Sequence, residues 1–103
     1  RIAIFANDAP APLGEAIAAA MVDEPLAPMA APVELTNARF GSVRKAYVLT
    51  LRDMAVSADL QLTMLGRGTV AEAVPLDTGH TPHVIAPDRL AVAILRAATP
   101  EFE

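Results

Sequence analysis

The chain of 103 residues contains no cysteine, so it has neither a disulfide framework nor a thiolate that could act as a nucleophile. This composition suits a reducing compartment, and we expect a cytoplasmic protein. Its lysine and arginine residues form no cluster and its net charge is -4, which argues against a nucleic-acid surface. No apolar run approaches the roughly 20 residues that span a bilayer, so we expect no membrane partner.

The sequence also has no Gly-x-Ser-x-Gly motif, the sharp turn that exposes the catalytic serine of many hydrolases. Ser42 and Ser57 are poor substitutes, because Ser42 precedes a predicted strand and Ser57 is predicted to cap a helix. Because the chain begins at Arg1 rather than at methionine, we expect a fragment or a processed product.

Hydrophobic residues make up 53% of the chain, which is too apolar for a disordered segment and predicts one small folded domain. The alanine-rich stretch Ala11–Met21 predicts a short helix, with Asn7 and Asp8 before it as turn or cap residues. Prolines in the stretch Glu24–Pro32 predict an extended connector, followed by a short strand at residues 33–35.

Two short apolar runs in the second half of the chain predict strands. Residues 45–51 and 71–76 show little polar alternation, which is typical of strands buried on both faces of a parallel sheet. Helices are expected after each strand, the first from Ser57 and the second from near Pro87 to about residue 99. Their expected inward-facing residues are Leu60, Met64 and Leu65 on the first helix and Leu90, Ile94 and Leu95 on the second.

The order strand, helix, strand, helix favours an α/β fold with a parallel sheet. Two parallel strands alone leave an edge without hydrogen-bond partners, so we expect further strands to complete the sheet.

Asp53 and His80 each follow one of the predicted strands. Reactive groups in open α/β sheets collect at the carboxyl ends of the strands, so these two residues should lie on neighbouring loops. A carboxylate that accepts a ring N–H bond from an imidazole fixes its tautomer and stabilises its charged form. The alternative is that Asp53 orders a turn and His80 is an ordinary loop histidine.

A metal site is not expected in the same loop. His83 lies three positions after His80, but Pro82 intervenes and only Asp77 offers a further ligand at a reasonable spacing. We therefore expect no metal and no cofactor, a solvent-facing or pocket-lining His83, and an Asp77 that helps to order its turn.

Two blocks of sequence together resemble the carboxyl-terminal portion of the α/β-hydrolase superfamily. The first reads Arg39-Phe-Gly-Ser-Val-Arg-Lys-Ala-Tyr-Val-Leu-Thr-Leu-Arg-Asp-Met-Ala-Val56 followed by Leu60-Gln61, and the second reads Asp77-Thr-Gly-His-Thr-Pro82 with Pro87. They are most similar to a branch that contains plant methylesterases, hydroxynitrile lyases and their bacterial relatives. Phe5-Ala-Asn-Asp8 and Pro25-Leu-Ala-Pro28 resemble the cap segment of that branch. The chain departs from it at Ala6, where an aromatic residue is common, and at His83, where an apolar residue is.

The resemblance implies the carboxyl-terminal part of an α/β-hydrolase fold, with a cap segment at residues 1–38 and strand-helix-strand-helix core at 39–103. It implies that Asp53 is the acid of a Ser-His-Asp triad and that His80 is the general base. The implied activity is the hydrolysis of small apolar carboxylic esters. The nucleophile and the oxyanion hole would lie in an amino-terminal half that is missing here, so we expect the isolated chain to be inactive.

Two other functions fit the same residues. A half-hydrolase without a nucleophile would act as a non-catalytic binding module, whose open strand edge recruits a partner or a second copy of the chain. The same scaffold also supports hydroxynitrile lyase-like chemistry. An upstream Gly-x-Ser-x-Gly in the same reading frame would favour the enzyme, and a start codon close to Arg1 without a serine-bearing partner would favour the binding module.

Overall fold

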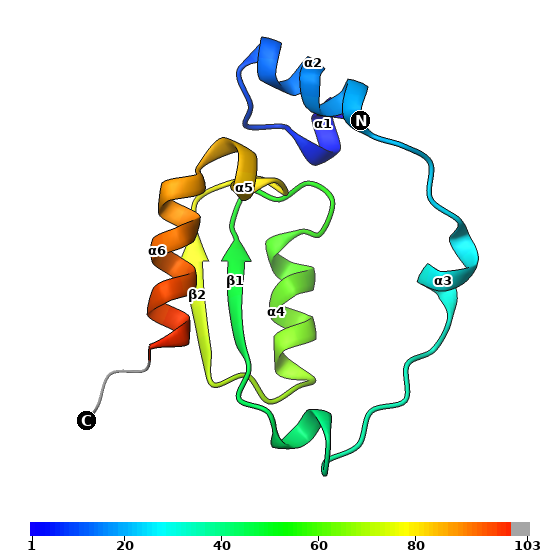
Figure 1. Ribbon diagram of the computed structural model, residues 1–103, viewed down its shortest axis with the longest axis vertical. Helices are drawn as coiled ribbons and strands as arrows, with labels where there is room; N and C mark the ends of the chain where they lie inside the picture. Colours follow the sequence, from blue (N-terminus) through cyan, green and yellow to red (C-terminus); the bar gives the residue numbers. More distant parts are fainter. Residues whose placement is uncertain (100–103) are drawn as a thin grey trace.

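A small parallel sheet forms the centre of the computed structural model, which describes residues 1–99 (Figure 1). Strand β1 spans Ala46–Thr50 and strand β2 spans Glu72–Leu76, and the two pair in parallel with Val48 opposite Val74. Helices surround this sheet, so the chain is a mixed α/β protein, as the sequence predicts.

Three helices follow the strands along the chain. Helix α4 spans Ala58–Gly66 and starts at Ser57, whose Oγ accepts a hydrogen bond from the backbone N–H of Leu60 at 3.2 Å. This bond confirms the predicted helix cap. The short helix α5 spans Pro82–Ile85, and α6 spans Pro87–Ala98 with a proline in its first turn, where no N–H group is needed.

Helices α4 and α6 cover opposite faces of the sheet. Neighbouring side chains of a strand point to opposite faces. The hydroxyl of Tyr47 donates a hydrogen bond to Gln61 of α4 at 3.3 Å, whereas the next residue, Val48, packs toward Ala93 and Ala97 of α6. The apolar core therefore lies between the sheet and α6, and the other face carries a polar contact.

The buried positions of both helices differ from the predicted ones. Ala93 and Ala97 are the buried residues of α6, and Gln61 is the buried residue of α4. A sheet of two strands is narrow, so it covers only the few side chains at the closest approach of each helix. For the same reason β1 is half-buried rather than enclosed on both faces. The predicted inward residues Ile94 and Leu95 are 52% and 65% exposed, and Leu60 and Met64 are exposed as well.

The amino-terminal helices lie over the carboxyl ends of the strands (Figure 1). Helix α1 spans Ile2–Phe5 and helix α2 spans Ala11–Ala20, and the two pack against each other. Helix α2 confirms the helix predicted for the alanine-rich stretch. This arrangement places the turn between α1 and α2 directly beside the loops that follow β1 and β2.

The segment between α2 and β1 is exposed along its whole length from residue 22 to residue 40. It contains the short helix α3, Leu26–Ala30, and a 3-10 turn, Phe40–Ser42. The strand predicted at residues 33–35 does not form, because no strand lies beside this segment to pair with it. Within residues 1–99, no helix has the length and apolar character needed to cross a membrane.

Candidate active site

The structure brings together the two residues that the sequence singles out for chemistry. Asp53 lies in the loop after β1 and His80 in the loop after β2, both at the carboxyl edge of the sheet. The Nδ1 atom of His80 is 2.9 Å from Oδ2 of Asp53 and 3.1 Å from Oδ1. These distances are those of a charge-assisted hydrogen bond.

The Asp53 carboxylate is buried, with 7% of the residue exposed, and both of its oxygens accept hydrogen bonds. The hydroxyl of Thr50 donates to Oδ2 at 2.9 Å. The backbone N–H groups of Ala55 and Val56 donate to Oδ1 at 2.8 and 2.9 Å, the pattern of an aspartate that closes its own turn. The turn-ordering and catalytic interpretations of Asp53 are therefore compatible, since the turn leaves Oδ2 facing His80.

The pKa of Asp53 is set by opposing effects. Burial alone would raise it, but hydrogen bonds from the Val56 backbone, the His80 ring, the Thr50 hydroxyl and the Ala55 backbone outweigh burial, and the pKa lies below its ordinary value. At neutral pH the carboxylate is therefore ionised. The donor in its contact with His80 is then the ring Nδ1–H.

The lowered pKa of Asp53 predicts a loss of stability in acid. A carboxyl group whose folded pKa lies below the unfolded value of about 3.9 stabilises the fold fully above that value, and this contribution disappears as pH falls through the folded pKa. We expect the urea concentration at the unfolding midpoint to decrease as the pH is lowered below about 4. Asp53→Asn should make this decrease smaller. Asp23→Asn is the control, because the Asp23 side chain is fully exposed. An equal acid-side slope in wild type and Asp53→Asn would contradict the prediction.

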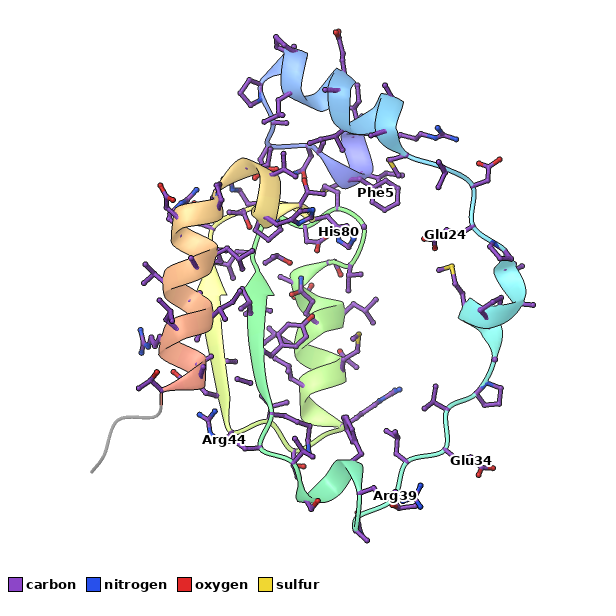
Figure 2. The ribbon with its side chains drawn as sticks, in the orientation of Figure 1. Phe5, Glu24, Glu34, Arg39, Arg44 and His80 are labelled. Atoms are coloured by element: carbon purple, nitrogen blue, oxygen red, sulfur yellow. The ribbon has the colours of Figure 1, made fainter. Side chains whose placement is uncertain are left out.

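His80 is arranged to exchange a proton at its second ring nitrogen. Because Nδ1 donates to Asp53, the basic lone pair of the neutral ring is on Nε2. The side chain is 35% exposed, so it remains accessible to a reacting group. The rings of Phe5 and His80 meet in a T-shaped contact with 5.4 Å between ring centroids, and Figure 2 shows the two side chains facing each other below α1.

The two loops are also joined directly to each other. The backbone N–H of Arg52 donates to the carbonyl of Thr78 at 2.9 Å, and Thr78 is fully buried. The Arg52 guanidinium donates to the Asp77 carboxylate at 2.8 Å and to its backbone carbonyl at 2.9 Å. The ion pair is exposed and contributes little. The backbone bond ties the two loops together just beyond the ends of the strands.

Gln61 fixes the backbone on both sides of Asp53. Its Nε2 donates to the carbonyls of Thr50 and Val56 at 2.9 and 2.8 Å, and its Oε1 accepts from the Thr50 N–H at 3.0 Å. Only 1% of Gln61 is exposed. Burial, and to a smaller extent the negative charge of Asp53, raise the pKa of Tyr47. Its hydroxyl therefore stays protonated and donates a further hydrogen bond to Oε1 of Gln61. The resemblance places a glutamine here, but its hydrogen bonds become visible only in the fold.

Other residues considered for chemistry lie in ordinary structural positions. Ser57 accepts the cap bond of α4, and Ser42 donates to the Arg39 carbonyl at 2.7 Å in the turn before β1, at the end of the sheet away from His80. His83 is exposed on α5. Among residues 1–99, no group of three or more acidic or histidine side chains could hold a metal ion.

Two residues of the site do more than the sequence predicts. Asn7 and Asp8 are predicted to form a turn or to cap the following helix; they do lie in a turn, but α2 begins at Ala11 without a side-chain cap. Their side chains also bond to Arg52 and Gly79, which are 45 and 71 residues away along the chain. Neighbouring turn-forming polar residues are a signal in the sequence, but local patterns do not reveal such distant partners.

No protein-family model matches this chain, and no curated protein matches it. The resemblance to α/β-hydrolases therefore stays a prediction from the residues quoted above.

Proposed function

We propose that this chain is the carboxyl-terminal portion of an α/β-hydrolase fold and supplies the acid and base of a cytoplasmic Ser-His-Asp carboxylic ester hydrolase. The observation that supports it best is the 2.9 Å contact between a buried, ionised carboxylate and Nδ1 of a partly exposed imidazole. Both side chains follow adjacent parallel strands, where such folds assemble their reactive groups. In this proposal residues 1–38 are the cap segment and 39–103 belong to the hydrolase core.

The proposed reaction begins at Nε2 of His80. A serine on the amino-terminal half gives its hydroxyl proton to Nε2 while its oxygen attacks the ester carbonyl, and the ionised Asp53 stabilises the resulting imidazolium. His80 then returns the proton to the departing alkoxide, which leaves an acyl-serine. Water resolves the acyl-serine by the same two proton transfers. Backbone N–H groups of the amino-terminal half would stabilise the oxyanion.

Apolar side chains near the pair favour a small apolar ester as the substrate. Phe5 lies against His80, and Met54 and Val56 follow Asp53 directly in the acid loop. Met54 is largely exposed and Val56 is partly exposed, so both are available to contact an acyl or alcohol group.

The backbone of β1 supports the idea that further strands complete the sheet. In a parallel pair, the backbone groups of successive residues point alternately to the two sides of a strand. The carbonyl of Lys45 and the N–H of Leu51 bond to the β2 side, so the groups of Ala46, Val48 and Thr50 point to the opposite edge. Gln61 satisfies Thr50 at this edge. In the described part of the chain, no strand lies beside Ala46 and Val48 on this edge.

The outer edge of β2 is less suited to pairing. The carbonyl of Leu76 accepts a hydrogen bond from Leu51, so by alternation the backbone groups of Leu76 and Val74 point toward β1 and those of Pro75 point outward. Proline has no N–H to donate and is confined to the edges of sheets. A further strand would therefore join beside β1 and not beside β2. This direction agrees with a hydrolase core that continues into an amino-terminal half.

The deciding experiment compares the chain alone with the chain joined to its upstream coding sequence. We expect the pure 103-residue chain to release no p-nitrophenol from short p-nitrophenyl esters above the buffer rate, because it lacks an activated nucleophile. Adding an upstream segment that carries Gly-x-Ser-x-Gly should restore turnover, and the Ser→Ala form of that segment is the control. Clear turnover by the isolated chain would defeat the proposal, as would an upstream frame without any such serine.

The open edge of β1 also supports a second candidate, a non-catalytic binding module. On that alternative the Ala46–Thr50 strand pairs with a partner strand or with a second copy of the chain, and no ester is cleaved. Sedimentation of the pure chain would reveal self-association. Binding of the upstream segment without turnover would favour this module over the esterase.

A further inference from the structure

A single turn near the amino terminus contacts both loops of the candidate site. The turn of residues 6–9 is closed by a backbone hydrogen bond of 3.1 Å between its first and last residues. The Asn7 side chain donates to the carbonyl of Arg52 at 2.9 Å, and Arg52 directly precedes the acid. The Asp8 carboxylate accepts from the backbone N–H of Gly79 at 2.8 Å, and Gly79 directly precedes the base.

The residue before this turn adds two contacts to the same loop. The backbone carbonyl of Phe5 accepts a hydrogen bond from the hydroxyl of Thr81 at 3.0 Å, and the Phe5 ring packs against the His80 ring. Three consecutive residues, 79 to 81, are thus held by Phe5 and Asp8. Figure 2 shows Phe5 and His80 adjacent below the amino-terminal helices.

The turn lies so close to the loop that carries His80 that position 79 requires glycine. A Cβ atom at Gly79 would overlap with the side-chain oxygens of both Asn7 and Asp8. Gly79 has no positive φ angle, so the reason for glycine here is space and not backbone conformation. Ala6 at the start of the turn is 1% exposed, so the turn is packed against its neighbours and does not simply lie on the surface.

The geometry points to Asn7 and Asp8 as positioning residues of the acid–base pair. Each bonds to the residue next to one member, so together they hold the two loops at the separation at which Nδ1–H of His80 donates to Asp53. Neither touches the reacting atoms. Their consequence for catalysis rests on the proposed function, whereas their effect on the His80 tautomer does not.

The test follows the two ring nitrogens of His80 by NMR in the ¹⁵N-labelled 103-residue chain. We expect Asp8→Leu to shift His80 away from the Nδ1–H tautomer, because its loop loses its anchor. Asp8→Asn should retain the wild-type signal, since the amide oxygen still accepts from Gly79. Asp23→Leu, which removes an exposed acid after α2, should also leave the signal unchanged. Asn7→Leu supplies an independent variant if Asp8→Leu does not fold.

The outcomes separate this inference from the proposed function. Unchanged His80 signals in folded Asp8→Leu and Asn7→Leu, with a shift in Asp53→Asn, would overturn the positioning role and leave the acid–base pair intact. No shift in Asp53→Asn would remove the pair itself and with it both proposals. In the complete esterase, Asp8→Leu should lower kcat roughly 10- to 100-fold with little change in KM, because it misplaces a catalytic group without touching substrate. Equal kcat in the Asp8→Leu and Asp8→Asn forms would contradict the inference.

Discussion

Replacing His80 with alanine is expected to lower kcat of the complete esterase about 10⁴- to 10⁶-fold, the loss typical of removing the base from a serine triad. The reason is that Nε2 of His80 is the proposed acceptor of the serine proton, and its partner Nδ1 is bound to Asp53 at 2.9 Å. Hydrolysis of a short p-nitrophenyl ester under saturating conditions measures the effect. KM should change much less than kcat, because the imidazole is proposed to act on the reaction and not on substrate binding.

His83→Ala is the matched control for that experiment. It removes the other histidine of the chain, three residues away, from an exposed position on α5. We expect kcat within about twofold of wild type, as for an ordinary surface substitution. Equal losses in His80→Ala and His83→Ala would show that the wrong histidine has been chosen as the base.

Replacing Gln61 with leucine is expected to lower the free energy of unfolding by about 2 to 4 kcal/mol. The side chain is 1% exposed, and its loss leaves the N–H and carbonyl of Thr50 and the carbonyl of Val56 without their partners. Leucine has a helix propensity similar to that of glutamine, so the loss would come from the hydrogen bonds and not from α4 itself. Urea unfolding followed by far-UV circular dichroism measures it.

Leu62→Ala provides the comparison on the same helix. Leu62 is the next residue along α4 and is 53% exposed, so its truncation should cost about 0.5 kcal/mol or less. If Gln61→Leu were no more destabilising than Leu62→Ala, the hydrogen bonds of Gln61 would not be what stabilises the loop that carries Asp53. Such a result would also remove the reason for placing Gln61 among the supports of Asp53.

The strands and their connecting helix could be predicted because their signals are local. The apolar runs at residues 45–51 and 71–76 contain β1 and β2, and Ser57 caps α4 as its position suggests. The strand expected at residues 33–35 failed because a strand needs a neighbour, and the sequence does not say whether one is present. Burial on α6 was misjudged for a related reason, since the width of the sheet decides which side chains are covered.

The site could be predicted only in its two central residues. Asp53 and His80 follow predicted strands, and the rule that loops at the carboxyl edge of a sheet converge is enough to suggest that they meet. Their supports could not be found in this way. Asn7 and Asp8 bond to residues 45 and 71 positions away, and no local pattern encodes contacts over such separations.

The amino-acid sequence alone determines that this is a small α/β protein with two parallel-type strands, an acid after the first and a histidine after the second. It does so because apolar periodicity and helix caps act over a few residues. Only the tertiary structure decides that the carboxylate is buried, that its oxygens are satisfied by the turn and that Nδ1 of His80 points at it. Those properties arise where β1, β2 and the turn of residues 6–9 meet, and a hydrogen bond between distant loops exists only when the chain brings them together.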